Sequence, residues 1–423
     1  MTFEGKKLLH VGGAMFQTPA IGCAKALGCE VILVDKDNEA PGIAFADVFE
    51  PVSTTDREGV LEVARRHEIN GVMTYASDSS TATVAYVAHE LGLPGSPLAA
   101  AELLQRKDRF RQFQHENGIP HPRFVTVDNP AEAESLSMNL PFPLVIKPVD
   151  SAGTKGQSVI HSREEIRAAY LYAVQFSGRG KVILERYIES NALELDGDVF
   201  FQNGELRFRH YGHNYFMRDR LSNVPCGEIF PGFFGPKVTR QLDEQFRTLI
   251  SALNLECGCI NFDGFISRET VYIIDIGLRN GGNFVPELIA LSTGFDLTRA
   301  AVCAALDVQV PCTGNESDCA EPVASYLVGS RSAGTLRDVT FSPDLAQYLV
   351  EYRPFLAEGS PVVPFTRSDR AAGVAFFRFP DMAALEDYTV RMESLVTIAL
   401  DHTDKAQVWP QGVANEIDAR KAL

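Results

Sequence analysis

The sequence predicts an α/β protein built from several domains. Its first part alternates short apolar runs with amphipathic stretches, a pattern typical of a parallel sheet with helices on its faces. Further along, residues 144–146 and 158–160 are strand-like runs joined by a loop of small residues, as in a β-hairpin. Residues 259–282 hold another pair of strand-like runs around a short polar turn. A chain of 423 residues has room for roughly two to four domains.

The N-terminal part, about residues 1–104, is predicted to be a Rossmann-like domain with a parallel sheet. Its expected elements, in chain order, are a strand at 7–11, a helix at 18–27, a strand at 30–35, a helix at 57–67, a strand at 71–75 and a helix at 80–91. Asp78 and Ser79, just before the last of these helices, are expected to be its N-cap residues.

A dinucleotide site is an alternative interpretation of this domain. Asp35 closes the second strand, where an acid would contact a ribose. However, the loop after the first strand has the sequence GGAMFQ, which lacks the GxGxxG spacing that brings backbone against a pyrophosphate. An NAD-dependent dehydrogenase is therefore kept only as a minor alternative.

A candidate nucleotide clamp follows the strand at residues 144–146, which ends in Lys147. Glycines let backbone approach a ligand closely, and N–H, hydroxyl and ammonium donors suit a polyphosphate. The residues of this loop with those properties are Ser151, Gly153, Thr154, Lys155 and Gly156. The GxxxxGK[ST] order of a P-loop is absent. An ordinary surface hairpin with a Gly-rich turn is the competing interpretation.

Two aspartates form the candidate metal site. Asp263 and Asp275 lie on the neighbouring strands predicted within residues 259–282, so both carboxylates can face one pocket. Buried carboxylates on strands are costly unless they are paired or bind a metal, which favours a magnesium ion between them and nucleotide phosphates. Arg279 and Asn280 follow directly on a Gly-rich loop. The alternative is that both aspartates are solvated edge residues.

Residues 209–235 are predicted to be a long loop that recognises the substrate, after a hairpin of strands at 198–202 and 205–210. It concentrates four potentially cationic side chains among aromatics, His210, His213, Arg218 and Arg220. Arginine forks suit a substrate carboxylate. Ion pairs with the many acids of the chain are the alternative role.

The remaining elements complete the core and a small C-terminal lobe, about residues 313–423. A long amphipathic helix is expected at 238–253, and a second helical segment at 283–307 is interrupted by Gly294. Glu287, near the start of that segment, is a further candidate for contact with the substrate or with Arg279.

Composition limits the classes of partner. The net charge of −16 argues against nucleic acid or an anionic membrane as a partner. The apolar run near the N-terminus is too short for a signal peptide or a membrane-spanning helix. The eight cysteines form no CxxC pair, which favours buried thiols in a reducing compartment over disulfides or zinc. We therefore expect a cytoplasmic enzyme acting on small molecules.

Taken together, these motifs resemble the ATP-grasp superfamily over most of the chain. The matching features are Lys107, within a helix expected at 99–117; Lys147 with its small-residue loop; the hinge-like segment Glu185, Arg186, Tyr187 and Ile188; and Asp263 and Asp275 followed by Arg279. The resemblance implies an ATP-grasp domain at about 105–312, with a flap subdomain at about 121–187.

The resemblance also implies roles for these residues. Lys107, Lys147 and the loop would contact ATP phosphates, the segment 185–188 would pair with the adenine, and Glu194 would contact the ribose, with Glu189 as the competing choice. Asp263 and Asp275 would bind Mg²⁺ or Mn²⁺. Arg279 would be catalytic, steadying the transferring phosphoryl group.

The implied activity is that of an ADP-forming carboxylate–amine ligase that works through an acyl phosphate. The string DIGLRNGGNFVPELIALSTGFDL looks most like ligases of the L-amino acid ligase type, so dipeptide formation is the specific hypothesis. Members of the superfamily are often dimers, so a homodimer is compatible with the resemblance.

One departure from the family pattern favours an alternative function. Gly277 stands where the family usually has an asparagine that binds metal, and both metal-binding acids are Asp rather than the more common Glu. Asn280 is a candidate replacement ligand. A nucleotide-binding protein with a degenerate site therefore remains an alternative. An ATP-grasp carboxylase that uses bicarbonate is a separate alternative.

Overall fold

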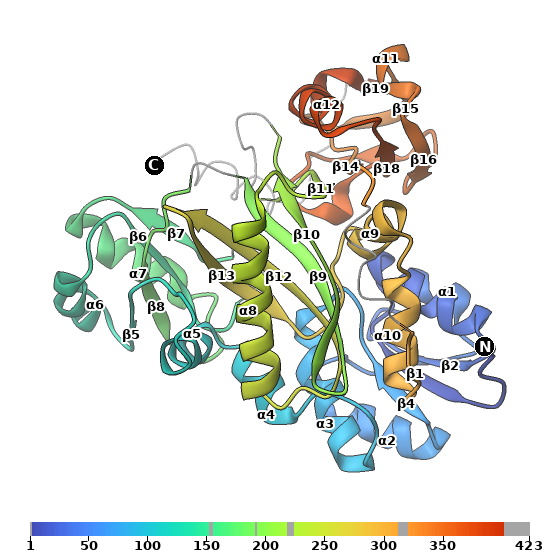
Figure 1. Cartoon of the computed structure of the whole chain (residues 1–423), viewed down its shortest axis with the longest axis horizontal. Helices are drawn as coiled ribbons and strands as arrows, with labels where there is room; N and C mark the ends of the chain where they lie inside the picture. The colour runs from blue at the N-terminus through green and yellow to red at the C-terminus, as the bar shows by residue number, and fades with distance from the viewer. Residues whose placement is uncertain (1, 152–154, 191–192, 218–223, 312–319, 402–423) are drawn as a thin grey trace.

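The computed structural model describes residues 2–151, 155–190, 193–217, 224–311 and 320–401. Figure 1 shows an N-terminal domain and a flap subdomain on opposite sides of a large central sheet, with the C-terminal lobe above the N-terminal domain. The α/β architecture predicted from the sequence is confirmed. The domain boundaries remain predictions.

The N-terminal domain is a four-stranded parallel sheet in the order β3-β2-β1-β4. Its strands are β1 (Lys7–Val11), β2 (Glu30–Val34), β3 (Val48–Glu50) and β4 (Gly71–Met73), and its helices are α1 (Thr18–Ala26), α2 (Arg57–His67) and α3 (Thr81–Leu91). Strand β2 is apolar and buried in four successive positions, as expected for a parallel strand covered on both faces.

The loop after β1 does not resemble a dinucleotide site. Asp35 accepts hydrogen bonds from the backbone N–H groups of Gly13 at 2.8 Å and Asp37 at 3.0 Å, so its carboxylate is used within the loop. The side chain of Gln17 lies over Gly12, where a Cβ atom would be 2.5 Å from the amide. These contacts oppose the dehydrogenase alternative.

The helix expected at residues 99–117 is two helices, α4 (Leu98–Leu104) and α5 (Lys107–Glu116). Arg106 has extended backbone angles and breaks the helix. The backbone N–H of Lys107 then donates to the carbonyl of Val149 at 2.8 Å. Lys107 therefore begins a helix next to the flap, instead of lying part-way along one.

The flap subdomain is an antiparallel sheet in the order β5-β8-β6-β7. Its strands are β5 (Phe124–Val127), β6 (Leu144–Pro148), β7 (Ser158–Ile160) and β8 (Val182–Arg186), with helices α6 (Pro130–Leu136) and α7 (Ile166–Val174). Strands β6 and β7 form the hairpin that the sequence predicts. A separate apolar core beneath α6 and α7 makes the flap a compact unit.

The central sheet has eight strands in the order β13-β12-β9-β10-β11-β14-β18-β16. Their bounds are β9 (Glu194–Gln202), β10 (Glu205–Tyr215), β11 (Gly227–Phe230), β12 (Cys257–Ser267), β13 (Thr270–Gly277), β14 (Val323–Leu327), β16 (Leu349–Pro354) and β18 (Gly373–Arg378). The strands of the C-terminal lobe therefore continue the central sheet. A second sheet of that lobe contains β15 (Gly334–Phe341), β17 (Pro361–Val362) and β19 (Val396–Asp401), with helices α11 (Pro343–Ala346) and α12 (Met382–Leu395).

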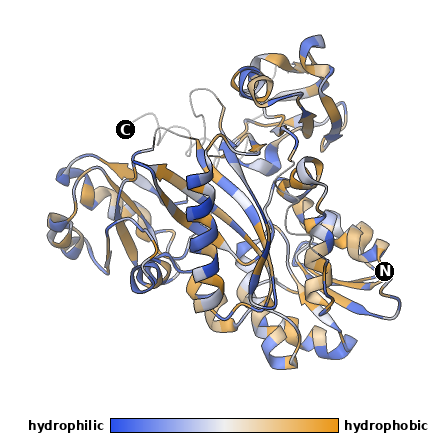
Figure 2. Ribbon diagram, viewed as in Figure 1, coloured by the Kyte–Doolittle hydropathy of each residue, from blue (hydrophilic) through white to orange (hydrophobic). Residues whose placement is uncertain are grey.

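The two faces of the central sheet differ in character. One face packs its alternate residues, such as Val199, Tyr211 and Phe262, against the apolar side of α8 (Pro236–Ala252). The other face packs against α9 (Val285–Thr293) and α10 (Leu297–Ala305), and α10 is coloured as hydrophobic along much of its length in Figure 2. The polar residues of the candidate site lie on this second face.

Gly294 separates α9 from α10, as predicted, with a left-handed φ of 79°. In the part of the chain that the structure describes, no single helix is long and apolar enough to cross a membrane. As a pair bent by 116°, α9 and α10 would qualify by length and composition alone.

The prediction of a long substrate loop at residues 209–235 is largely wrong. Residues 209–215 belong to β10, which stays paired with β9 along its length, and residues 227–230 belong to β11, which lies between β10 and the distant strand β14. Arg218 and Arg220 lie outside the described residues.

Candidate active site

Three carboxylates lie side by side across the polar face of the central sheet. The strand register pairs Asp275 of β13 with Asp263 of β12, and Asp263 with Asp196 of β9. The two predicted metal ligands are therefore direct neighbours, and a third acid continues their row. Asp196 is only 4% exposed, and its Oδ2 has no hydrogen-bond partner among the described residues.

Further polar residues surround this row, and we did not predict them from the sequence. Asp198, two residues after Asp196 on the same strand, accepts hydrogen bonds from Asn261, Asn280 and the backbone of Gly281 at 3.0–3.2 Å. Glu228 of β11 accepts from Asn283 at 3.0 Å and from the Ser325 hydroxyl at 2.5 Å. Acids at alternate positions of a strand, as in Leu195-Asp196-Gly197-Asp198, are the sequence signal that could have located this face.

Burial sets the ionisation of these acids. It raises the pKa of Asp263 to about 6, helped by the neighbouring charge of Asp275, and raises the pKa of Asp198 to about 6 and of Glu228 to about 7. Burial and the charges of Asp263 and Glu228 place the pKa of Asp196 well above its ordinary value. Burial and the neighbouring acids thus disfavour the ionised forms of these carboxyls, a cost that a bound cation would offset.

Lys107 supplies one positive charge at the end of the row. Its Nζ lies 2.6 Å from Oδ2 of Asp275. Burial disfavours the ionised form of Asp275, but Lys107 outweighs that effect and lowers the pKa of the carboxyl. The fold thus brings Lys107 and Asp275, which are far apart in the sequence, into contact.

Lys147 belongs to a second, fully buried ion-pair group. Its Nζ lies 2.8 Å from Oε2 of Glu185, and Nε of Arg111 lies 2.8 Å from Oε1 of the same residue. Burial lowers the pKa of Lys147, while Glu185 opposes that shift. The Glu185 side chain thus holds Lys147 at the end of β6, a role that its expected place in the adenine hinge did not suggest.

Arg279 pairs with Asp78, a residue that we predicted to be a helix N-cap. Its Nε and Nη2 each donate to one carboxylate oxygen of Asp78 at 2.8 Å. Asp78 was expected to cap a helix, but its side chain turns to Arg279, and the helix α3 begins with Ser80 in the cap position and no side-chain cap bond. Burial opposes the charge of Arg279, yet Asp78 outweighs it and raises the pKa of the guanidinium.

The hinge segment follows β8 at the edge of the flap sheet. The backbone N–H groups of Arg186 and Tyr187 donate to the carbonyls of Arg123 and Pro143 at 2.8 and 3.0 Å. Ile188 comes next, half-buried, and Glu194 begins β9 after the gap in the described residues. Glu185 is thus paired on both sides, with β5 and with β6, and the segment leaves the sheet after Arg186.

The flap loop is only partly described. Gly153 and Thr154 lie outside the described residues, Ser151 is half-buried and Lys155 is exposed. Gly156 has a φ of 74°, and a Cβ there would lie 2.8 Å from the ring of Phe176. Both the backbone angle and the close contact require glycine at this position.

His210 and His213 are not the cationic substrate contacts that we predicted. Both are buried on β10 and stack against Phe230 and Phe233, respectively. Burial lowers the pKa of His210 to about 3 and that of His213 to about 4, so both rings are neutral near pH 7. They act as polar core residues, with His210 bonded to the hydroxyl of Ser292 at 3.1 Å.

Glu287 is half-buried in the first turn of α9, and neither of its oxygens has a hydrogen-bond partner among the described residues. It does not bind Arg279, whose hydrogen bonds go to Asp78, Asn261 and the carbonyl of Asn280. Burial raises the pKa of Glu287 to about 7. The residue lines a cavity of about 330 Å³ between α1, α9 and α10.

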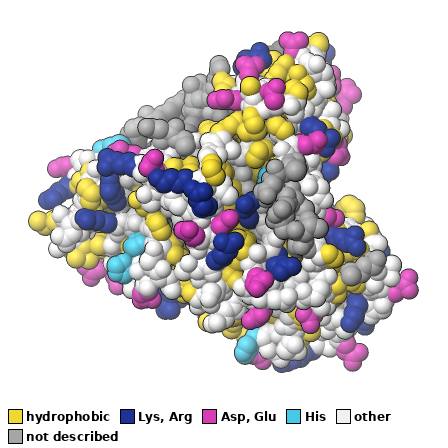
Figure 3. Space-filling model, viewed as in Figure 1, with side chains coloured by type: hydrophobic (Ala, Val, Ile, Leu, Met, Phe, Trp, Pro, Cys, Tyr) yellow, Lys and Arg dark blue, Asp and Glu magenta, His cyan; other side chains and the backbone are white. Residues whose placement is uncertain are grey.

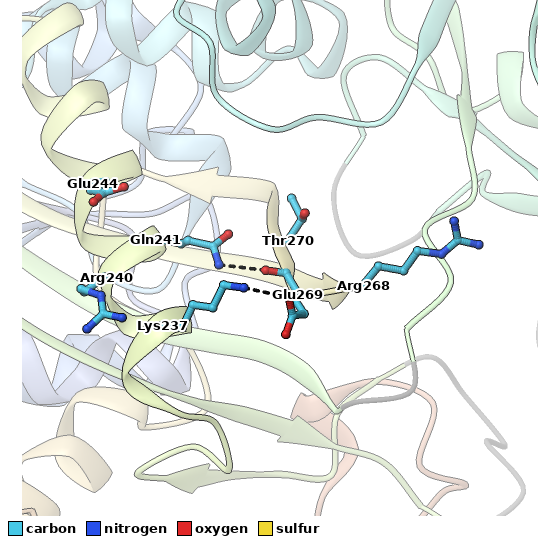
Figure 4. A pocket seen from close by; sticks show the side chains of 7 residues that line it. All are labelled: Lys237, Arg240, Gln241, Glu244, Arg268, Glu269 and Thr270. Atoms are coloured by element: carbon cyan, nitrogen blue, oxygen red, sulfur yellow. Dashed lines mark hydrogen bonds and ion pairs between the residues drawn. The ribbon is translucent and has the colours of Figure 1, made fainter.

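A larger surface pocket of about 380 Å³ lies elsewhere (Figure 4). It is formed by the start of α8 and the turn between β12 and β13, and its walls are held by contacts of Lys237 and Gln241 with Glu269 at 2.8 Å. Because α8 covers the sheet face opposite to the acidic row, this pocket is not the nucleotide site.

The surface charge is uneven although the chain is acidic overall. Figure 3 shows a band of Lys and Arg side chains that crosses this side of the molecule from the flap toward α8. Because α8 lies on this side, the band is on the side of the central sheet opposite to the acidic row.

The donor set fits a hard cation with additional ligands. Within the described ranges, no three His, Cys, Asp or Glu side chains converge as a complete metal site. Two neighbouring carboxylates would leave several positions of Mg²⁺ to phosphate oxygens and water, which is how this ion is usually held. The residues therefore fit a magnesium ion that arrives with a nucleotide.

Replacing Asp263 by Asn is expected to stabilise the protein without metal, increasingly so at higher pH. From pH 3.8, the ordinary pKa, to about 6, the unfolded chain has lost this proton while the folded protein keeps it. The stability of the wild type therefore falls as pH rises through this window, and the variant escapes that loss. We expect the stability difference to grow by about 1–2 kcal/mol between pH 4.5 and 7.5.

Urea unfolding in EDTA at both pH values measures this difference. The exposed Asp307, changed to Asn, is the matched control and should show a difference that does not depend on pH. If the stability difference between the wild type and Asp263→Asn were the same at both pH values, Asp263 would ionise as easily in the folded protein as in the unfolded chain.

Comparisons with known proteins identify related domains and related folds. A model of the ATP-grasp N-terminal domain matches residues 22–95, and a model of the ATP-grasp domain matches residues 112–196. The chain is 33% identical over 192 residues to a formate-dependent phosphoribosylglycinamide formyltransferase from Synechococcus sp. (strain WH7803), covering 44% of this chain and 49% of that protein. The chain thus spans about half the length of the curated relatives it matches.

Solved structures are similar over nearly the whole chain. An L-amino acid ligase from Bacillus licheniformis superposes with a TM-score of 0.77 at 19% identity, covering 95% of this chain and all of that one. The biotin carboxylase domain dimer of Hydrogenobacter thermophilus 2-oxoglutarate carboxylase, in complex with MgADP and bicarbonate, gives a TM-score of 0.76 at 16% identity, covering 93% of this chain and 91% of that one. Residues 22–95 and 112–196 thus match two ATP-grasp domain families, and the fold is shared with these solved structures over nearly the whole chain.

Proposed function

We propose that this protein is an ATP-dependent ligase that activates a carboxylate as an acyl phosphate and joins it to an amine, releasing ADP and phosphate. The observation that carries the proposal is the row of Asp275 and Asp263, with Lys107 at its end and Arg279 on the loop that follows. This arrangement puts groups that bind a metal and phosphates beside a guanidinium suited to a carboxylate.

ATP would lie between the flap and the polar face of the central sheet. Lys107, Lys147 and the flap loop with Ser151, Lys155 and Gly156 would contact its phosphates, and the segment from Glu185 to Ile188 would meet the adenine. Asp263 and Asp275 would hold Mg²⁺, which offsets negative charge on the phosphates. The superposed carboxylase domain, whose structure contains MgADP, supports this placement by fold.

The reaction would take place in two steps. A carboxylate oxygen attacks the γ-phosphorus and ADP leaves, giving the acyl phosphate. The amine, after losing a proton, then attacks the acyl carbon, and phosphate leaves as the amide forms. Arg279 would stabilise the charge that develops on the transferring group and on the tetrahedral oxygen. A side-chain nucleophile is not required.

An amino acid is the proposed acid, with a second amino acid as the amine. The fold of the L-amino acid ligase supports this choice over the whole chain. The sequence relative is formate-dependent by name, so formate belongs among the acids to be tested. A bicarbonate-dependent carboxylase is the second candidate, favoured by the superposed carboxylase domain.

The proposal is tested by phosphate release from ATP and Mg²⁺ over a matrix of acids and amines, with mass spectrometry of the products. Amino acids singly and in pairs, formate and bicarbonate form the acid axis. We expect release that needs one acid and one amine and gives a product equal to their summed mass less water. Release with bicarbonate alone as the acid would establish the carboxylase, and ATP binding with no release under any condition would indicate a degenerate site.

A further inference from the structure

We propose that Asp78 of the N-terminal domain is the residue that positions Arg279, and that residue 277 is glycine because the Asp78–Arg279 pair occupies the space of its side chain. The inference deepens the proposed function and depends on it for its catalytic part. It concerns the contact between two segments 201 residues apart in the sequence.

The guanidinium of Arg279 is held from several sides. Nε and Nη2 donate to the two oxygens of Asp78 at 2.8 Å, which is the bidentate geometry. Nη1 donates to Oδ1 of Asn261 at 2.6 Å and to the carbonyl of Asn280 at 3.0 Å. Of the five N–H groups of an arginine, these four bonds leave one, on Nη2, for a ligand. The orientation of the group is therefore fixed before any substrate binds.

Gly277 lies where a side chain would collide with this pair. A Cβ built on Gly277 would be 2.3 Å from Oδ1 of Asp78 and 2.7 Å from Nε of Arg279. The backbone of Gly277 is not in the left-handed region, so its conformation does not require glycine. Glycine is required at this position because the Asp78–Arg279 pair fills the space that a side chain would need.

An amide on the neighbouring strand lies directly opposite Gly277. Asn261 is the register partner of Gly277, and its Oδ1 reaches Arg279. The ATP-grasp pattern that this chain resembles has asparagine at the position of Gly277. Here Asn261 and Asp78 surround Arg279 instead, and this arrangement gives a physical reason for the departure that otherwise favoured a degenerate site.

The pair is suited to orientation more than to stability. The Arg279 side chain is 12% exposed and that of Asp78 is 42% exposed, so the carboxylate keeps contact with water. Ion pairs with such an exposed partner contribute little to folding. A fixed guanidinium, in contrast, needs no reorganisation when charge develops on the substrate.

The test compares Asp78→Asn, Gly277→Asn and the double variant Asp78→Ala/Gly277→Asn in full-length protein. Asp78→Asn should lower kcat by about 10- to 100-fold while the affinity for MgADP stays within about twofold, because misplacement of a catalytic group has effects of this size. Gly277→Asn should lower kcat at least as much. The double variant removes the nearer of the two collisions, that with Asp78, and restores the amide of the family pattern, so it should recover at least about tenfold over Gly277→Asn.

Ser79→Ala is the matched control, because among the described residues its exposed hydroxyl is hydrogen-bonded only to Ser77. It should leave kcat unchanged, and the melting temperature of each variant reports whether it is folded. An unchanged kcat for Asp78→Asn, or a folded double variant that recovers nothing over Gly277→Asn, would overturn the positioning role.

The failure of the proposed function is recognised separately, since the wild type would then turn over no substrate pair. In that case the contact between Asp78 and Arg279 is tested by the Nε–H signal of Arg279 in ¹⁵N NMR. This signal is assigned by its loss in Arg279→Lys. We expect one shifted, slowly exchanging signal in the wild type that reverts to the free-arginine position in Asp78→Asn and in Gly277→Asn. A signal unmoved by either substitution would show that Asp78 does not hold the guanidinium.

Discussion

Replacing Glu185 by Gln is expected to destabilise the protein by about 3–5 kcal/mol, the usual effect of removing one partner from a buried ionic group. Glu185 is 3% exposed and is the shared partner of Lys147 and Arg111, whose side chains are 6% and 0% exposed. Glutamine keeps the size of the side chain but removes the charge. Two buried cations would then be left without a counterion, and the burial that already lowers the pKa of Lys147 would act unopposed.

Denaturant unfolding of the wild type and the variant measures this effect. Glu189→Gln, which removes an exposed carboxylate four residues away, is the matched control and should change stability by less than about 0.5 kcal/mol. A loss below about 1 kcal/mol for Glu185→Gln would contradict the buried ion-pair group and with it the placement of Lys147.

Replacing Arg279 by Ala is expected to lower kcat by about 10²- to 10³-fold, the size seen when a charge-stabilising donor is removed from an active site. MgADP affinity should change little, because the proposed role of Arg279 concerns the transferring group and the oxyanion. Lysine at this position keeps the charge but cannot reproduce the bonds to Asp78 and Asn261, so Arg279→Lys should remain at least about tenfold below the wild type.

Steady-state kinetics with the identified substrate pair provide the measurement. Arg268→Ala, at an exposed arginine of the surface pocket in Figure 4, is the control and should retain full activity. If Arg279→Ala kept its kcat, or lost activity only through weaker nucleotide binding, Arg279 would not act on the reacting groups.

Several elements could be predicted from the sequence because their signals are local. The strand that ends in Lys147 is a short apolar run closed by Pro148, and the hairpin around Gly156 follows from the glycines and small residues of the loop. The neighbouring positions of Asp263 and Asp275 follow from two strands joined by a short turn. The break at Gly294 follows from the residue itself.

Other parts depend on contacts that are distant in the sequence, and these were missed or misassigned. Asp78 sits before a helix, where an N-cap is the ordinary role, and only the fold shows that Arg279 lies beside it. His210 and His213 looked like loop cations because nothing nearby in the sequence shows that β10 is buried. The helix break before Lys107 arises from extended backbone at Arg106 and the hydrogen bond of Lys107 to Val149, which belongs to the flap.

The row of acids on the central sheet combines a local sequence signal with contacts between distant residues. Asp196 and Asp198 occupy alternate positions of one strand, a local pattern that was available in the sequence. Their alignment with Asp263 and Asn261 was not available, because in the register of β9 against β12 these pairs are more than 60 positions apart in the sequence. A row of acids can therefore be suspected from one strand, but the residues that complete it require the sheet.

The central claim is that a carboxylate attacks the γ-phosphate of ATP, and isotope transfer tests it most directly. The protein is incubated with ATP, Mg²⁺ and the pool of amino acids labelled with ¹⁸O in their carboxyl groups, in unlabelled water. The released phosphate is then analysed by mass spectrometry. Activation as an acyl phosphate predicts one ¹⁸O atom in each phosphate released, because the bridging oxygen comes from the carboxylate. ADP formation with unlabelled phosphate would contradict the account and assign the attack to water or bicarbonate.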